Sequence, residues 1–290
     1  PVALKIQDFI PRATRSGLVN NWDQSYPADT IKSIATIKLD HNFTSQGKLS
    51  GYYSRYWGPH YNGSDGLPVP ITKVRRFATA TDTIRVTYDW TLSPTTLLNS
   101  RVGFVRHWNP DFGLPEVLNF DPMAGLGLRG AVNGIGFPVI GSMFTQTGGG
   151  MSEGMANAGS LPATKKPQAL VNITHSRNTH TYKAGVEWRN DIFSIPVING
   201  SHGAYTFSNQ QTALPSTQGQ NLGGGNVGLP YASFLMGLVN NASVSNPTDP
   251  NWRKPAVSAF VQDTWRVKSA LTIDYGLRWD RQAYGYEQND

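Results

Sequence analysis

The sequence lacks cysteine altogether and has few charged side chains. Without cysteine, thiol catalysis, disulfide bonds and zinc sites with thiolate ligands are excluded. Charged residues make up only 15% of the 290 positions, against about 25% in an average soluble protein. No run approaches the roughly 18 consecutive apolar residues of a membrane-spanning helix. The fold must therefore be held together by packing and hydrogen bonds alone.

Acidic residues are scarcer than basic ones, and 19 acidic against 25 basic side chains give a formal net charge of +6. The basic residues are scattered along the chain, with a few adjacent pairs such as Arg75-Arg76 and Lys165-Lys166. Because a nucleic-acid-binding surface needs clustered lysine and arginine, we expect no nucleic-acid partner. The chain opens at Pro1 without a secretory signal, so we expect it to be processed or an internal piece.

Apolar and polar residues alternate with a period of two along the chain, as they do in half-buried strands. The clearest case is 271–280, where Leu, Ile, Tyr, Leu and Trp alternate with Thr, Asp, Gly, Arg and Asp. Residues 84–91 and 181–189 alternate in the same way. The 8 Trp, 12 Tyr and 12 Phe argue against disorder, since disordered chains are poor in aromatic residues.

This periodicity predicts eight strands, joined alternately by short and long connections. The strands are expected at about 31–43, 48–57, 73–90, 96–108, 168–176, 180–191, 256–267 and 271–281. Tight turns are expected at 44–47, 93–94, 177–178 and 268–270. The links 58–72, 109–167 and 192–255 are long and rich in Gly, Pro, Asn and Ser.

Short turns on one side and long loops on the other are typical of an outer-membrane β-barrel. Lipid also explains the alternation, because a closed antiparallel sheet pairs every backbone group and can present apolar residues to the bilayer. A soluble β-sandwich or propeller is the alternative, but turns in sandwiches recur every ~8 to 12 residues. We therefore predict an all-β fold, an antiparallel transmembrane β-barrel segment with long extracellular loops.

Residues 257–267, Val-Ser-Ala-Phe-Val-Gln-Asp-Thr-Trp-Arg-Val, and 271–280, Leu-Thr-Ile-Asp-Tyr-Gly-Leu-Arg-Trp-Asp, form a specific motif. They closely resemble a barrel hairpin of TonB-dependent outer-membrane receptors. The residues that carry the motif are Phe260, Gln262, Asp263, Trp265, Tyr275, Gly276 and Arg278. Upstream, residues 31–43 and 48–53 are similar to a hairpin of the Oar-like branch of these receptors.

The resemblance implies a barrel of about 22 strands around a plug domain, with uptake of a scarce ligand driven by a TonB-type energy-transducing complex. Eight strands are about a third of such a barrel, and neither a plug nor a TonB-contacting box is visible. We therefore expect 1–290 to be a partial barrel domain, with 1–30 a loop and strand remnant and 31–281 the eight strands. The expected partners are outer-membrane lipid, the plug domain and remaining strands, the TonB-type complex and an unidentified ligand. The expected location is the outer membrane of a Gram-negative bacterium.

Two sets of residues are candidates for function. Charged side chains opposite the apolar positions would point into the lumen, where they hold a plug, tune ion passage or merely solvate the interior. This set comprises Arg85, Asp89, Arg101, Glu187, Arg189, Asp274 and Arg278. Aromatic residues of the long connections are candidates for extracellular ligand contact: Tyr61, Trp108, Phe112 and Phe137.

No residue constellation predicts catalysis. Residues 125–130 have the glycine spacing of a dinucleotide-binding loop, but no strand precedes them and no helical pattern follows. His175 and His180 flank a turn without a third metal ligand. We expect no enzymatic activity, no metal site and no cofactor. The leading prediction is a transport barrel; the alternatives are a secreted or surface carbohydrate-binding module, which would stack sugar on the loop aromatics, and an ungated porin.

Overall fold

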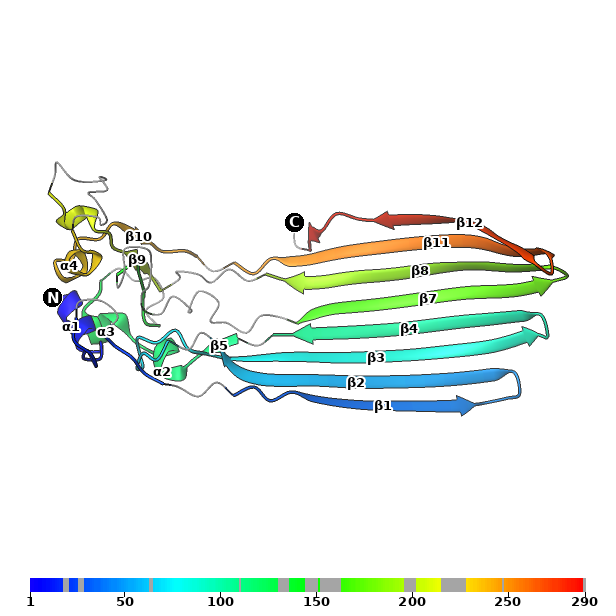
Figure 1. Cartoon of the computed structure of the whole chain (residues 1–290), viewed down its shortest axis with the longest axis horizontal. Coiled ribbons are helices and arrows are strands. Elements are labelled where there is room, and N and C mark those ends of the chain that lie inside the picture. Colours follow the sequence, from blue (N-terminus) through cyan, green and yellow to red (C-terminus); the bar gives the residue numbers. More distant parts are fainter. Residues whose placement is uncertain are drawn as a thin grey trace.

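The structure is a computed structural model that describes residues 1–17, 21–25, 29–62, 65–109, 111–129, 136–143, 151, 163–195, 202–214, 228–246 and 248–288. In this part of the chain, no helix is both long enough and apolar enough to cross a membrane. The described residues form a large antiparallel sheet and, at one end of it, a smaller module of short helices and strands (Figure 1).

The large sheet consists of eight long strands that follow one another in chain order. They are β1 Ser33–Asn42, β2 Gly47–Asn62, β3 Arg75–Ser93, β4 Thr96–Trp108, β7 Thr164–Arg177, β8 His180–Ser194, β11 Asn251–Lys268 and β12 Leu271–Gln282. All neighbours are antiparallel, and the short strands β5 (Asp111–Gly113) and β13 (Tyr286–Glu287) pair with β3 and β11. The structure confirms the eight predicted strands and their antiparallel order.

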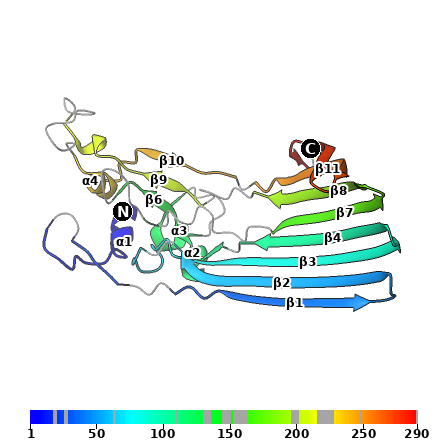
Figure 2. The same cartoon turned by 45° about the vertical axis from the view of Figure 1, so that its right-hand side comes forward.

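The four tight turns lie together at one end of the sheet, and the long connections lie at the other (Figures 1 and 2). The turn between β7 and β8 places Asn178 at φ 54°, a left-handed conformation that asparagine tolerates better than most residues. This is the arrangement of short turns and long loops that the spacing of the strands predicted.

The strands are staggered along the sheet. Residues that are paired directly from one strand to the next form a cross-strand row. The row that contains Asn42, the last residue of β1, includes Phe260 of β11. Strand β11 then continues for eight more residues, 261–268, before its turn. This stagger, about one residue per strand, is the shear that tilted strands of a barrel require.

The sheet has two open edges. Strand β1 pairs with β2 and strand β12 pairs with β11, and among the described strands these two edges do not pair with each other. In hydrocarbon an unpaired backbone group costs several kcal/mol, so a spanning sheet cannot keep such edges. A membrane-inserted form must pair both edges, either with each other or with further strands.

The second region, which we call the loop module, is built from described parts of the long connections and from the first residues of the chain. It contains α1 Val2–Gln7, α2 Pro115–Leu118, α3 Pro122–Leu126, α4 Pro230–Leu235, the 3₁₀ turn η2 Gln210–Thr212, and the strands β6 Val139–Gly141, β9 Ala204–Thr206 and β10 Asn241–Ser243. The three strands form a small sheet in the order β10-β9-β6, with β6 and β9 parallel. Residues 1–30 were expected to be a loop and strand remnant; residues 2–7 instead form a helix, and Thr30 forms an isolated antiparallel bridge with His60.

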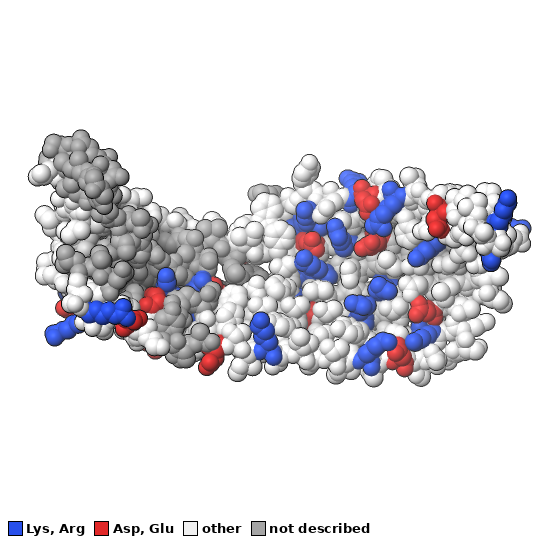
Figure 3. All heavy atoms as spheres, in the orientation of Figure 1, with Lys and Arg blue, Asp and Glu red and all other residues white. Residues whose placement is uncertain are grey.

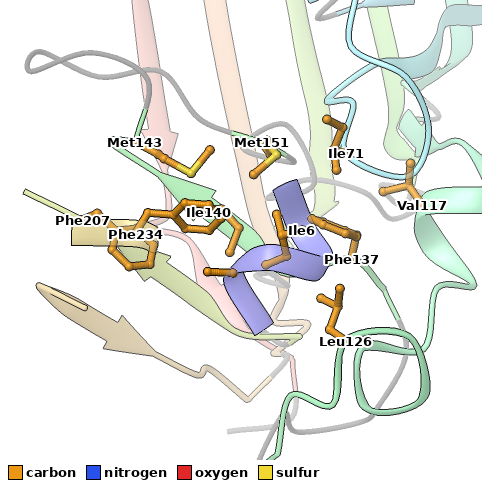
Figure 4. Close-up of a cluster of buried hydrophobic side chains, with 11 residues drawn as sticks. Ile6, Ile71, Val117, Leu126, Phe137, Ile140, Met143, Met151, Phe207 and Phe234 are labelled. Carbon is orange, nitrogen blue, oxygen red and sulfur yellow. The ribbon is translucent and has the colours of Figure 1, made fainter. Parts of the chain in front are cut away.

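The loop module has its own hydrophobic core (Figure 4). Its buried members come from distant parts of the chain: Ala3, Ile6, Ile71, Val117, Leu126, Phe137, Ile140, Met143, Met151, Phe207 and Phe234. Phe137 is fully buried, and its ring packs against Phe9 and Phe120 at centroid distances of 6.2 and 4.9 Å. The described parts of the long connections are therefore packed together.

Local signals explain the short helix α3. The Asp121 carboxylate accepts hydrogen bonds from the backbone N–H groups of Met123 and Ala124, at 2.8 and 3.0 Å, which caps the helix N-terminus. Gly127 ends the helix at φ 76°, a conformation that glycine adopts at little cost. Gly125 and Gly127 of the glycine spacing thus lie at a helix C-terminus, whereas a dinucleotide-binding loop leads into a helix N-terminus.

A buried ion pair holds β5 against the start of β3. The Arg75 guanidinium donates from Nη1 to Asp111 Oδ2 at 2.6 Å, and the two side chains are only 14% and 5% exposed. Burial raises the pKa of the Asp111 carboxyl despite the attraction of Arg75, which acts in the opposite direction. The pair fixes the chain as it leaves the sheet for the loop module.

Candidate functional site

The pairing register assigns every strand residue to one of two faces, because directly paired residues project to the same side of a sheet. One face carries an apolar band about four residues deep. Two of its rows are Leu39, Gly51, Val86, Val102, Ala169, Trp188, Val257 and, on the edge strand β12, Arg281, and His41, Leu49, Tyr88, Ser100, Val171, Val186, Ala259 and Trp279. Leu277 is 73% exposed on this face and Val186 55%, so no part of the described chain covers the band.

Polar residues border the apolar band at both ends. On β11 the apolar-face side chains run from Arg253 to Asp263 through Pro255, Val257 and further apolar residues. Ten residues at ~3.3 Å each span about 33 Å, which a strand tilt of ~40° reduces to about 25 Å of membrane thickness. The two polar borders are thus separated by about the height of the apolar band of outer-membrane barrels.

The border at the tight turns centres on Asp263, a motif residue. Its side chain is only 7% exposed, and its Oδ2 lies 2.7 Å from His180 Nδ1 and 2.6 Å from Tyr275 Oη. The His180 ring stacks on Trp265 at 5.4 Å. Aromatic and histidine side chains therefore enclose the single carboxylate of this border, at the level where an aromatic girdle belongs.

The opposite face of the sheet is polar, and charged side chains gather on it (Figure 3). All seven residues predicted to point into a lumen project from this face. Arg85 shares a cross-strand row with Arg189, Arg101 shares one with Glu187, and Asp89 shares one with Arg278. Asp274 lies nearer the tight turns, opposite Thr264, whose hydroxyl donates to its Oδ1 at 2.5 Å. The structure thus brings the predicted set to one face, whereas its contact with a plug stays a prediction.

Arg278 is the centre of an ion-pair network on the polar face. Its Nη2 lies 2.9 Å from Asp280 Oδ1 and 3.6 Å from Glu187 Oε2, and it donates to Ser258 Oγ at 2.9 Å. These residues and Arg189 line a hollow of about 100 Å³. The hollow is polar and has room for a few water molecules or one inserted side chain.

The other polar-face residues have weaker or local partners. The Arg85 guanidinium lies 5.3 Å from the centre of the Tyr52 ring, and Asp89 accepts a hydrogen bond from Asn99. Within the described part of the chain, Arg101 and Arg189 form no ion pair. Their positive charges are consequently available to carboxylates of another element inside a barrel.

Three further motif residues have a packing role. A methyl group on Gly185 would lie 2.6 Å from the Phe260 ring, so the glycine opens the space that this ring fills on the polar face. A methyl group on Gly276 would lie 2.6 Å from the Val261 carbonyl oxygen, which only glycine avoids. Gln262 of β11 pairs directly with Gly276 of β12. These motif residues therefore allow β8, β11 and β12 to pack closely.

The four predicted ligand-contact residues do not lie together. Tyr61 is an exposed residue near the end of β2, and Trp108 ends β4 on the apolar face beside Arg106. Phe112 belongs to β5, but its side chain lies outside the described residues. Phe137 is fully buried in the core of the loop module, so as a surface contact it is wrong.

A cavity in the loop module is a candidate ligand site that the sequence did not reveal. It has a volume of about 340 Å³ and lies between α1, α4 and β9, lined by Ile6, Tyr205, Phe207, Phe234 and other apolar residues. Burial raises the pKa of the Tyr205 hydroxyl, which keeps it neutral. Its lining residues are far apart in sequence and share no local pattern. Among the described residues, no group of three His, Cys, Asp or Glu side chains could hold a metal ion.

A family model of known proteins agrees with this geometry. A family model described as "Outer membrane beta barrel domain" matches residues 1–290. Curated proteins give no match. Among solved structures, the chain is similar to the outer membrane transporter YddB from Escherichia coli, with 8% identity and a TM-score of 0.34. The similarity covers 90% of this chain and 35% of that one, so the chain spans about a third of the length of this transporter.

Proposed function

The chain belongs to the outer-membrane β-barrel domain family and is located in the Gram-negative outer membrane, and from this premise we propose that it is part of the barrel of a TonB-dependent receptor. In this proposal the receptor belongs to the Oar-like branch. It takes up a scarce ligand with energy from a TonB-type complex, inside a barrel of about 22 strands. The chain itself has no catalytic role and no cofactor.

The observation that carries the proposal is the division of the sheet into two faces. The apolar face fits lipid, and the polar face carries the seven predicted charged residues, of which Arg101 and Arg189 have no ion-pair partner in the described chain. A plug domain with acidic groups would supply such partners. The motif residues at 257–280, which resemble the receptor family, form the predicted hairpin β11–β12.

The loop module supports extracellular ligand binding. It lies at the end of the sheet opposite the tight turns, and in outer-membrane barrels the long loops are extracellular. Protease added to intact cells should therefore cut within 109–167 or 192–255 and spare 44–47 and 268–270. Cleavage of the tight turns with protection of both long connections would contradict this orientation in the membrane.

An ungated porin is the second candidate, because its sheet would have the same two faces. Ion conductance of the purified full-length receptor that contains these residues, called the full chain below, separates the two functions in planar lipid bilayers. A plugged receptor should show no steady conductance until urea unfolds the plug, and stepwise conductance afterwards. Steady conductance before urea is added would contradict the proposal and favour the porin.

Energy coupling requires its own test. The full chain in detergent should cross-link to the purified periplasmic domain of a TonB-type protein, and addition of an unrelated periplasmic protein serves as the control. Equal cross-linking to both proteins would contradict the energy-coupled function. The carbohydrate-binding module is disfavoured, because Phe137 is buried and a secreted protein would leave the apolar band in water.

A further inference from the structure

Three basic residues lie side by side on the apolar face, just beyond the apolar band at the loop end. The register pairs Arg55 of β2 with Asp82 of β3, Asp82 with Arg106 of β4, and Arg106 with Lys165 of β7. We call Arg55, Arg106 and Lys165 the outward cation cluster. One pair further toward the tight turns on the same face, the row is Tyr53, Ile84, Phe104 and Pro167. The cluster is thus continuous with the apolar band.

The internal carboxylate only partly neutralises the cluster. Arg55 Nη1 lies 3.6 Å from Asp82 Oδ1 and Arg106 Nη1 lies 3.7 Å from Asp82 Oδ2, distances too long for direct hydrogen bonds. Tyr53 Oη donates to the same carboxylate at 3.0 Å. Lys165 is exposed and forms no ion pair within the described chain. Three cations against one anion leave a net charge of +2 with most of their donors unused.

Exposure and aromatic neighbours fit an interfacial position. The side chains of Arg55 and Arg106 are 51% and 44% exposed. The Arg106 guanidinium lies 5.4 Å from the centre of the Trp108 ring, and Trp57 shares a cross-strand row with Trp108. Tryptophan is enriched at membrane–water interfaces, where its ring lies among the headgroups. The cluster therefore lies at headgroup level rather than in bulk water.

We propose that the outward cation cluster binds phosphate groups of a phosphorylated glycolipid in the outer leaflet of the membrane. The long connections are extracellular in this family, so the loop end of the lipid-facing surface meets the outer leaflet. Arginine binds phosphate with two parallel hydrogen bonds, and lysine binds it as a point charge. Because the cluster is continuous with the apolar band, a molecule with acyl chains and phosphates fits both surfaces, whereas a free anion fits only the cations.

The proposal is tested by binding of purified lipopolysaccharide to the full chain in mild detergent, measured by native mass spectrometry. The test variant is the triple substitution Arg55→Gln, Arg106→Gln, Lys165→Gln. A matched control, Arg177→Gln, Arg266→Gln, Lys268→Gln, removes three exposed cations at the tight turns instead. Each cation near an anionic lipid surface contributes about a fivefold factor, so the test variant should bind about a hundredfold more weakly. The control should bind like the unmodified chain.

Two further arms use the unmodified chain and so do not depend on whether the variants fold. Enzymatically dephosphorylated lipopolysaccharide should bind as weakly as the test variant binds the intact lipid. Inorganic phosphate at millimolar concentration should not displace the intact lipid. Equal binding of the phosphorylated and dephosphorylated lipids would overturn the proposal, and displacement by inorganic phosphate would show an anion site rather than a lipid site.

Discussion

The sheet and the loop module differ in how their apolar side chains are removed from water. In the sheet, the apolar side chains of one face remain exposed in the isolated chain, with Leu39 at 72% and Leu277 at 73%. In the loop module, Phe137, Ile71 and Met143 are completely buried against other parts of the same chain. The sheet therefore relies on lipid to cover its apolar residues, whereas the loop module carries its own core and is suited to water.

This difference separates what stabilises each region. Hydrophobic burial within the chain stabilises the loop module, and each large core side chain contributes through its removal from water. The sheet is held by cross-strand hydrogen bonds, and its apolar face contributes only when the bilayer replaces water. Substitutions of the same kind should consequently have different effects in the two regions.

The largest effect is expected in the core of the loop module. Phe137→Ala should lower the free energy of unfolding of this module by about 3 to 5 kcal/mol, because it removes a buried ring and leaves a cavity. Chemical denaturation of the full chain in lipid vesicles, followed by limited proteolysis of the loops, measures the change. Phe43→Ala is the control, since Phe43 is 60% exposed beside a tight turn. A loss below about 1 kcal/mol for Phe137→Ala would show that the module has no core of its own.

The next effect concerns the apolar face at mid-membrane. Val186 lies in the middle of the apolar band, and Val186→Arg should destabilise the inserted barrel by about 2 to 4 kcal/mol. Ile273 lies on the same face but only two residues beyond the tight turn, so Ile273→Arg should cost about 0 to 1 kcal/mol. Urea unfolding in vesicles compares the two variants. Equal costs would contradict the band as the register defines it.

A smaller effect is expected from pH in the loop module. Burial lowers the pKa of His202 below its ordinary value of 6.5, so the folded module favours the neutral imidazole. Its contribution to stability is complete above about pH 6.5 and declines as pH falls through the folded pKa, by at most about 1.4 kcal/mol per pH unit. His202→Gln should flatten this dependence between pH 7.5 and 5.5 in the same proteolysis assay. If His202→Gln left the pH dependence unchanged, a group other than His202 would be responsible for it.

The difference between the sheet and the loop module also explains which features the sequence could predict. The eight strands and the common face of the seven charged residues followed from a period of two, which each strand carries within itself. The faces of 84–91 and 271–280 needed no knowledge of their neighbours. The pattern predicts which residues share a face but not how many strands complete a barrel.

The loop module could not be predicted in this way. Its helices are four to six residues long, and its core takes single residues such as Ile6, Val117 and Phe234 from distant segments. No local period marks such residues, so Phe137 was mistaken for a surface residue. The place of Asp263 could not be predicted either. Its carboxylate lies on the lipid-facing side because it is hydrogen-bonded to His180 and Tyr275, which lie on neighbouring strands.

The central claim is that the apolar face of the sheet contacts lipid and the charged face does not. Spin labels at Val186 and Glu187, adjacent residues of β8 that project to opposite faces, test it most directly in the full chain in lipid vesicles. The label at 186 should be relaxed strongly by oxygen, which is lipid-soluble, and weakly by a water-soluble nickel chelate, and the label at 187 should show the reverse preference or protection from both. Equal accessibility of the two labels to oxygen, or a stronger oxygen effect at 187, would contradict the account.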